Sequence, residues 1–181
     1  MSRIAIPDRA ATPAISQPLL DAVEKQLGVV PNLHRLAALS PAVLQGMLGL
    51  NGALAKVLDV KTRERIAIAV AQVNGCDYCL SAHTYLGLNL ARLDASEVEL
   101  NRRGASSDPK AAAAVAFAVK VAQSRGQVSD ADLQTVRAAA FTDAQIVEIV
   151  ALVAENVLTN FLNNVARTDI DFPVVSVSEA A

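Results

Sequence analysis

The sequence predicts an all-α protein that folds as a single domain over residues 1–181, and three observations predict it. Apolar residues recur with helical spacing along most of the chain, while strand-like alternation is confined to the short ends. N-cap residues, prolines at first helical positions and glycine stops separate the periodic stretches. A length of 181 residues also suits one compact domain with a substantial core.

The first helices are read from their end signals. Ser40-Pro41 opens a helix that runs to about residue 57, because Ser is a favoured N-cap and Pro fits the first turn. Asp59 precedes the next helix, which stops at Asn74-Gly75 because both residues tolerate the left-handed conformation. A further helix is expected from about residue 76 to about residue 90.

The second half has comparable signals. Asp94 and Glu97 have capping-box spacing, as do Thr142 and Gln145 before a long apolar helix. An Ala-rich helix begins after Asp108-Pro109, and another helix is capped by Ser129. Residues 1–15 and 168–181 are looser, and we expect them to wrap the bundle or a neighbouring subunit.

Composition restricts the class of protein. Apolar residues make up 52% and charged residues 19%, which is typical of a globular chain rather than a disordered one. The net charge is −2 without a Lys/Arg cluster along one face, so nucleic-acid binding is not expected. The apolar runs are too short to span a bilayer, and the N-terminus lacks the apolar stretch of a secretory signal. The sequence therefore predicts a cytoplasmic protein without a membrane partner.

One pattern occurs twice at a constant offset. Glu64-x11-Cys76-x2-Cys79-x3-His83 matches Glu148-x11-Asn160-x2-Asn163-x3-Arg167. Duplication of a helical hairpin, with chemistry kept only in the first copy, would explain this match. Two Ala/Val-rich amphipathic helices can also resemble each other by chance. The second copy raises a further choice, because its asparagines fit either a contact with the site or a solvated helix face.

The first copy carries the chemistry. The two cysteines of the chain lie three residues apart, and in a reducing compartment such a pair favours redox chemistry or metal binding over a structural disulfide. On a helix that starts near Cys76, residues Cys76, Cys79 and His83 share one face. The helix N-terminus stabilises negative charge and predicts a lowered pKa for Cys76, while His83 can accept or donate a proton.

Glu64 is the fourth candidate catalytic residue. Its neighbours one and two turns on are apolar, and such surroundings favour the protonated form of a carboxylate, which suits a proton shuttle. A turn at Asn74-Gly75 would bring Glu64 over the dithiol. The alternative is an exposed carboxylate that pairs with Lys61 or a nearby arginine.

These residues resemble a known family. The spacing Glu64-x11-Cys76-x2-Cys79-x3-His83 is similar to the signature of the AhpD-like alkylhydroperoxidases, within the carboxymuconolactone decarboxylase family. The chain more closely resembles the peroxidase-related subgroup, over about residues 28 to 173. The segments that carry this are Val30-Pro31-Asn32, Asn74-Gly75-Cys76-Asp77-Tyr78-Cys79, Leu100-Asn101-Arg102-Arg103-Gly104, Ser129-Asp130-Ala131-Asp132-Leu133, Thr159-Asn160-Phe161 and Asp171-Phe172-Pro173.

The resemblance implies an AhpD-like helical bundle that assembles as a homo-oligomer, a dimer, trimer or hexamer. It implies a hydroperoxide substrate, with Cys79 as the peroxidatic cysteine, Cys76 as the resolving one, and Glu64 and His83 as a proton relay. No bound cofactor or metal is implied, but an external dithiol reductant, dihydrolipoamide-like or thioredoxin-like, is required. Tyr78 departs from the best-known members, which carry a second histidine there.

Other functions fit parts of the pattern. Cys76, Cys79, His83 and Glu64 could ligate zinc, although no second Cys/His pair exists in the sequence. A general disulfide oxidoreductase, or a decarboxylase-like enzyme on the same fold, would use the scaffold differently. A non-catalytic protein with two buried cysteines is the remaining alternative. Tyr78 and Tyr85 share a face of the motif helix and fit a substrate entrance, a subunit interface or the core.

Overall fold

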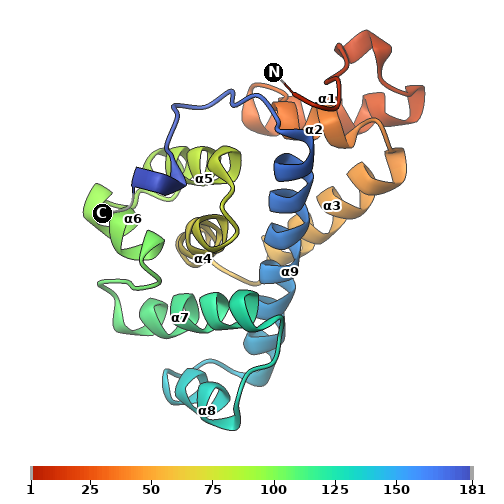
Figure 1. Cartoon of the computed structure of the whole chain (residues 1–181). Helices are drawn as coiled ribbons and strands as arrows, with labels where there is room; N and C mark the ends of the chain where they lie inside the picture. The colour runs from red at the N-terminus through yellow and green to blue at the C-terminus, as the bar shows by residue number, and fades with distance from the viewer. Residues whose placement is uncertain (1, 180–181) are drawn as a thin grey trace.

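The computed structural model describes residues 2–179, and within them all regular secondary structure is helical, without a strand (Figure 1). The all-α prediction is therefore confirmed. The α-helices of the described residues, in chain order, are α1 (Gln17–Leu27), α2 (Asn32–Ala37), α3 (Pro41–Leu54), α4 (Val60–Val73), α5 (Asp77–Asn89), α6 (Ala95–Arg102), α7 (Pro109–Ser124), α8 (Asp130–Ala138) and α9 (Asp143–Ala166).

Helix α4 is the centre of the bundle. In Figure 1 it is seen nearly end-on, with α5, α6, α7 and α9 packed around it. The sequence of α4 explains this position, because its run from Ile66 to Ala71 is buried on every side. A helix that is apolar all round belongs in a core rather than at a surface.

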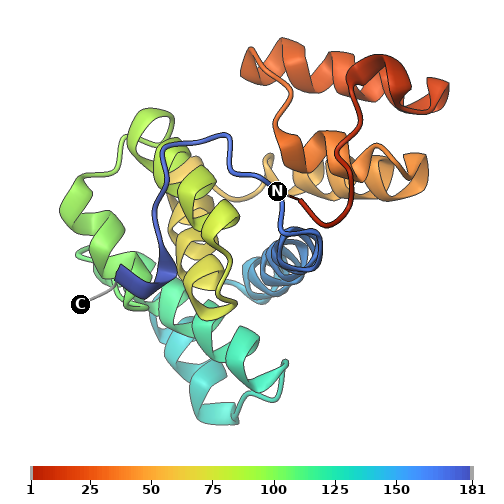
Figure 2. The same ribbon diagram turned by 45° about the horizontal axis from the view of Figure 1, so that its top comes forward.

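The first three α-helices form a separate cluster beside the bundle, as Figure 2 shows. Leu20, Leu44 and Met47 are at the centre of this cluster. Helix α3 also contacts α9, so the cluster joins the bundle at the long C-terminal helix. A second apolar core lies between α4, α7, α8 and α9, and a third surrounds the α4–α5 pair.

The C-terminal segment wraps the bundle as expected. After α9 the chain crosses over α5 towards α6 (Figure 1). The Val177 amide donates to Asp77 Oδ1 at 2.8 Å, the Val175 amide donates to Ser81 Oγ at 2.9 Å, and Arg102 donates to the Ser176 carbonyl at 2.9 Å. At the other end, the Arg3 amide donates to the Ala166 carbonyl. Residues 1, 180 and 181 of these ends lie outside the described residues.

Most of the predicted helix starts are confirmed. Both halves of a capping box are formed at Ser129 with Asp132 and at Thr142 with Gln145. The box predicted at Asp94 is wrong. The Asp94 side chain makes no cap bond to α6, and the Glu97 carboxylate binds Arg65, Asn101, Ser106 and Ser107 rather than the Asp94 backbone N–H.

The interpretation of the second copy as another helical hairpin is also wrong. The second copy of the pattern lies on α9, which runs unbroken for 24 residues. The turn of the first copy at Asn74-Gly75 corresponds by offset to Leu158-Thr159, and neither of these residues favours the left-handed conformation. The chain therefore does not fold back at this point.

Helix α9 is also the one α-helix of residues 2–179 that is long and apolar enough to cross a membrane. Core helices of soluble proteins pass the same test, and 44% of its most apolar window is buried inside the protein. It therefore does not indicate a membrane protein. The cytoplasmic location stays a prediction.

Candidate active site

The α4–α5 hairpin brings the four predicted catalytic residues together. Helix α4 ends at Val73, and Gly75 adopts the left-handed conformation with φ of 63°, as the stop signal predicts. Cys76 is then the N-cap of α5, and Cys79 and His83 follow on the same helix. Glu64 reaches this group from α4, the other arm of the hairpin.

Glu64 and His83 form a close pair. His83 Nδ1 lies 2.8 Å from Glu64 Oε2, and the Glu64 side chain is buried. Burial lowers the pKa of His83, but the negative charges of Glu64, Cys79 and Glu155 outweigh it and raise the pKa above its ordinary value. The alternative of an exposed Glu64 that pairs with Lys61 is therefore wrong. The site holds a histidine that tends to keep its proton.

Cys76 does not behave as its helix position alone predicts. Its sulfur accepts the backbone N–H of Cys79 at 3.2 Å, so it does cap α5. Its pKa is nevertheless raised, first by its side-chain hydrogen bond with Cys79 and next by complete burial. The prediction of a lowered pKa for Cys76 is wrong, because a single N–H donor does not compensate for an apolar surrounding and a neighbouring thiolate.

Cys79 is the acidic member of the pair. Burial opposes ionisation of its thiol, but the hydrogen bond with Cys76, the charge of His83 and the amides of Asn163 and Asn160 lower the pKa to about 7. A substantial fraction of Cys79 is therefore thiolate near neutral pH, with a protonated thiol beside it.

Helix α9 contributes a row of asparagines to the site. Asn163 Nδ2 donates to Cys79 Sγ at 3.2 Å. Asn160 Oδ1 accepts from Asn74 Nδ2 at 2.8 Å, and Asn164 Nδ2 donates to the Asn74 carbonyl at 3.0 Å. Helix α9 thus holds both the turn before Cys76 and the sulfur of Cys79.

The solvated-face interpretation fails for two of these asparagines, because Asn160 is 0% and Asn163 is 2% exposed. Their role had one signal in the sequence. The constant offset of the repeated pattern pairs Asn163 with Cys79, and these two side chains are in contact.

Glu155 is a site residue that the sequence did not reveal. It is buried on α9, and its electrostatic neighbours are Asn51 on α3, His83 on α5 and Arg63 on α4. Burial raises its pKa, while these three neighbours oppose the shift. The only sign in the sequence is an acidic residue in a long apolar helix.

The two tyrosines of α5 contact the C-terminal segment through Phe172. The Tyr78 hydroxyl accepts the Leu33 backbone N–H at 3.0 Å, and its ring meets Phe172 edge-on at 5.9 Å. Tyr85 also contacts Phe172 with its centroid 5.9 Å away. Of a substrate entrance, a subunit interface and the core, the core fits Tyr78. Tyr78 packs the C-terminal segment against α5 and does not replace the histidine that the best-known AhpD enzymes carry at this position.

The zinc alternative receives no geometric support within residues 2–179. No group of three or more His, Cys, Asp or Glu side chains in that range is arranged to hold a metal ion. The Glu64 carboxylate pairs with His83, and the Asn163 amide donates to the sulfur of Cys79. What the arrangement offers is a nucleophilic thiolate, a second thiol and a proton donor.

Comparison with known proteins agrees with the motif. Residues 41–122 match the carboxymuconolactone decarboxylase family model, and this range contains α4, α5 and all four motif residues. An uncharacterised protein of Haemophilus influenzae is 51% identical over 45 residues, which is 24% of this chain and 40% of that protein.

Solved structures extend the likeness to the whole fold. The AhpD core of a peroxidase-related protein from Ralstonia eutropha is 28% identical, with a TM-score of 0.83 over 94% of this chain and 92% of the other. A peroxidase-related protein from Silicibacter is 24% identical, with a TM-score of 0.80 over 93% and 91%. The debrominase Bmp8 is 19% identical, with a TM-score of 0.78 over 93% and 92%, which shows a shared fold alone.

The motif, the family match and the structural likeness point the same way. Residues 41–122 match the carboxymuconolactone decarboxylase family, and the chain as a whole has the AhpD-like fold of the peroxidase-related proteins from Ralstonia and Silicibacter.

Proposed function

We propose that this protein is a thiol-dependent hydroperoxide reductase in which Cys79 is the nucleophile. The observation that carries the proposal is the lowered pKa of Cys79 beside a protonated thiol and the Glu64–His83 pair. The peroxidase-related name of the Ralstonia protein supports the same class of reaction.

The first step forms a sulfenic acid. The Cys79 thiolate attacks one oxygen of R–O–OH, the O–O bond breaks, and the sulfur becomes Cys79–SOH. The leaving oxygen takes its proton from the imidazolium of His83, so that R–OH departs as an alcohol, or as water when the substrate is hydrogen peroxide. Glu64 keeps His83 charged before the reaction and takes part in its reprotonation afterwards.

The second step closes the cycle. The Cys76 thiol attacks Cys79–SOH to form the Cys76–Cys79 disulfide and releases water. An external dithiol then reduces this disulfide by exchange and leaves as its own disulfide. We propose a small dithiol of the dihydrolipoamide type, because a protein reductant needs more access to the sulfur atoms than a small one.

Burial also separates this function from its rivals. Cys76 is 0% and Cys79 is 2% exposed, which suits small reactants better than the protein disulfides of a general oxidoreductase. A decarboxylase-like reaction leaves the dithiol without a role. Merely structural cysteines do not need the amide and imidazole groups that gather around Cys79.

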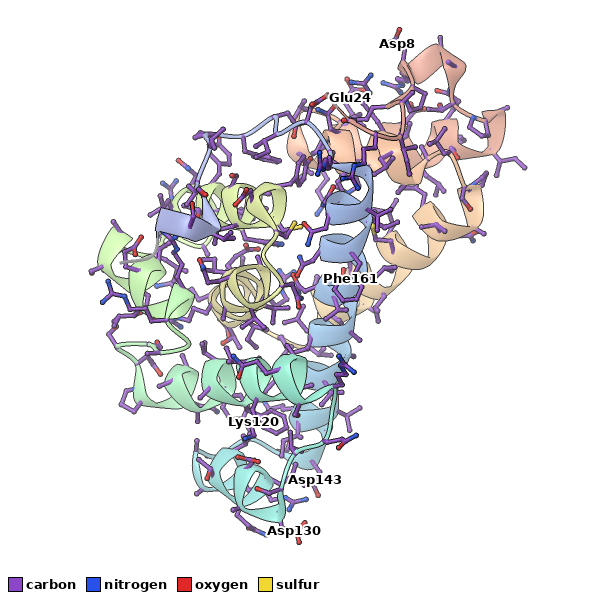
Figure 3. All side chains as sticks on the ribbon, viewed as in Figure 1. Asp8, Glu24, Lys120, Asp130, Asp143 and Phe161 are labelled. Carbon is purple, nitrogen blue, oxygen red and sulfur yellow. The ribbon has the colours of Figure 1, made fainter. Side chains whose placement is uncertain are left out.

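Self-association is part of the proposal. Helix α9 presents an exposed apolar stripe of residues that share one helix face: Val147, Val150, Leu158, Phe161 and Val165. Figure 3 labels Phe161 on this helix. Because the stripe is uncharged and spans about 27 Å at 1.5 Å per residue, we propose a second copy of the same chain as its occupant. Sedimentation of wild type and Phe161→Glu tests this, and equal masses would contradict it.

The decisive test of the function is peroxide consumption with dihydrolipoamide or dithiothreitol as the reductant. Wild type is expected to turn over hydrogen peroxide and small alkyl hydroperoxides, and Cys79→Ser is expected to be inactive. Unchanged turnover in Cys79→Ser would disprove the proposed function.

A further inference from the structure

Two amide side chains of α9 have hydrogen-bonding groups that the fold itself does not use. Asn160 and Asn163 are buried, and a buried amide group without a partner costs free energy. In each side-chain amide one of the two polar groups forms a hydrogen bond: Asn160 Oδ1 accepts from Asn74, and Asn163 Nδ2 donates to Cys79. Within the described residues, the other two groups, Asn160 Nδ2 and Asn163 Oδ1, are buried without a hydrogen-bond partner.

The unused groups lie at the sulfur of Cys79. Asn163 contacts this sulfur directly, and the Asn160 amide is close enough to stabilise its negative charge. The two asparagines are three residues apart on one helix and therefore share a face. Among residues 2–179, the site thus presents an acceptor without a partner, Asn163 Oδ1, and a donor, Asn160 Nδ2, whose one interaction is with the negative charge of Cys79.

This pair matches the chemistry of a hydroperoxide. The terminal O–H of R–O–OH needs an acceptor, and its oxygens, above all the leaving oxygen, need a donor as the O–O bond breaks. We propose, on the basis of the proposed function, that Asn160 and Asn163 bind the hydroperoxide group. In this arrangement Asn163 Oδ1 accepts the O–H of the hydroperoxide, and Asn160 Nδ2 donates to a hydroperoxide oxygen.

The two remaining bonds of these asparagines position the site. Asn163 Nδ2 holds the Cys79 sulfur, and Asn160 Oδ1 holds Asn74 in the turn that precedes the cysteines. The nucleophile and the peroxide are thereby aligned by the same two side chains. Alignment of reacting groups, and donors already placed for developing charge, both accelerate such a displacement.

The test compares two reagents that need the same thiolate. Iodoacetamide alkylates Cys79 without a peroxide group, whereas hydrogen peroxide and tert-butyl hydroperoxide oxidise it in a single turnover. Both rate constants are measured in a Cys76→Ser background, above the pH at which Cys79 is fully ionised. The ratio of the oxidation rate to the alkylation rate cancels the reactivity of the thiolate and reports the groups that act on the peroxide.

The variants separate the parts of the proposal. Asn160→Asp keeps the oxygen that accepts from Asn74 but replaces the Nδ2 donor, and Asn163→Ala removes the acceptor. Both are expected to lower the ratio about tenfold or more. Asn163→Ala should also raise the alkylation midpoint by about one pH unit, because a hydrogen bond to the thiolate is lost.

Asn156→Ala is the matched control, since Asn156 is also buried on α9 but its amide donates to the Leu152 carbonyl of its own helix. Its ratio should equal that of wild type. In wild type itself, the Asn163 side-chain amide resonances should move with the Cys79 titration, which needs no variant to fold.

The two proposals fail in different ways. If Cys79 of the wild-type pair is not oxidised by any hydroperoxide, the proposed function falls and this inference falls with it. If Cys79 is oxidised but Asn160→Asp and Asn163→Ala keep the wild-type ratio, the inference is wrong while the reductase function stands.

Discussion

Cys76 and Cys79 are three residues apart on one helix, and their surroundings differ in almost every respect. Cys76 lies at the N-cap of α5, where its sulfur accepts one backbone N–H, its thiol hydrogen-bonds to Cys79, and its other neighbours are apolar. Cys79 faces α9, where an asparagine amide donates to its sulfur and the charge of His83 stabilises the thiolate. The same helix therefore carries one thiol that keeps its proton and one that loses it.

The difference shows that a helix N-terminus alone does not select a nucleophile. Cys76 has the better position along the helix, but Cys79 has the better neighbours: Asn163 of α9, and His83 of α5, which Glu64 of α4 holds. These neighbours decide which thiol reacts. The proposed division of labour, with Cys79 as attacker and Cys76 as resolver, follows from this contrast.

The largest expected effect separates the two cysteines. Cys79→Ser should reduce peroxide turnover to the level of the buffer, because the thiolate itself is the nucleophile. Cys76→Ser should still be oxidised once, and a sulfenic acid at Cys79 should accumulate and be trapped by dimedone. Turnover and trapping by mass spectrometry measure both. Dimedone labelling of Cys76 in Cys79→Ser would reverse the assignment.

The next effect concerns His83, the proposed proton donor to the leaving oxygen. His83→Gln should lower the rate of sulfenic acid formation by about 10²-fold, because both the charge and the transferable proton are lost. Glu64→Gln should lower the rate of sulfenic acid formation less, about tenfold at pH 7. The reason is that loss of the Glu64 charge lowers the pKa of His83, by about one unit or more for a lost partner charge. Stopped-flow oxidation kinetics are the measurement. Equal rates in all three proteins would exclude the relay.

The pH dependence tests the thiolate directly. The pKa of Cys79 is lowered to about 7, so its oxidation rate should rise about tenfold per pH unit below pH 7 and level off above it. The raised pKa of His83 favours the imidazolium that protonates the leaving oxygen. A rate that still rises steeply at pH 8.5 to 9 would mean that Cys79 has an ordinary thiol pKa.

The smallest effect is expected at Glu155. Its buried carboxylate is one of the charges that raise the pKa of His83, after Glu64 and Cys79. Glu155→Gln should therefore lower the upper pH limit of activity and reduce the rate only two- to threefold, roughly the weight of a secondary charge. A complete pH–rate profile is needed to detect it. A loss as large as that of Glu64→Gln would place Glu155 in the relay itself.

The sequence predicts much of the fold and of the hairpin site. Caps and stops located α4, α5, α7 and α9, because local backbone chemistry sets where these helices begin and end. The i, i+3 and i+7 spacing correctly placed both cysteines and His83 on one helix, and the motif added Glu64 from the other arm.

The sequence did not predict what arrives from distant segments. The pKa of Cys79 is lowered first by Cys76 and His83 of its own helix, but also by Asn163, which is 84 residues beyond Cys79. Glu155 and Asn51 reach the site from helices whose packing no local pattern specifies. The Glu97 carboxylate likewise accepts from Ser106 and Ser107 of the following loop instead of completing the predicted capping box.

The most direct test of the central claim is the order in which the two thiols react. Reduced wild-type protein is treated briefly with substoichiometric iodoacetamide at pH 7, and the Cys76 and Cys79 adducts are quantified by peptide mass spectrometry. Cys79 is expected to carry nearly all of the label, with a midpoint near pH 7 in a pH series. Preferential labelling of Cys76, or equal labelling of both, would contradict the account.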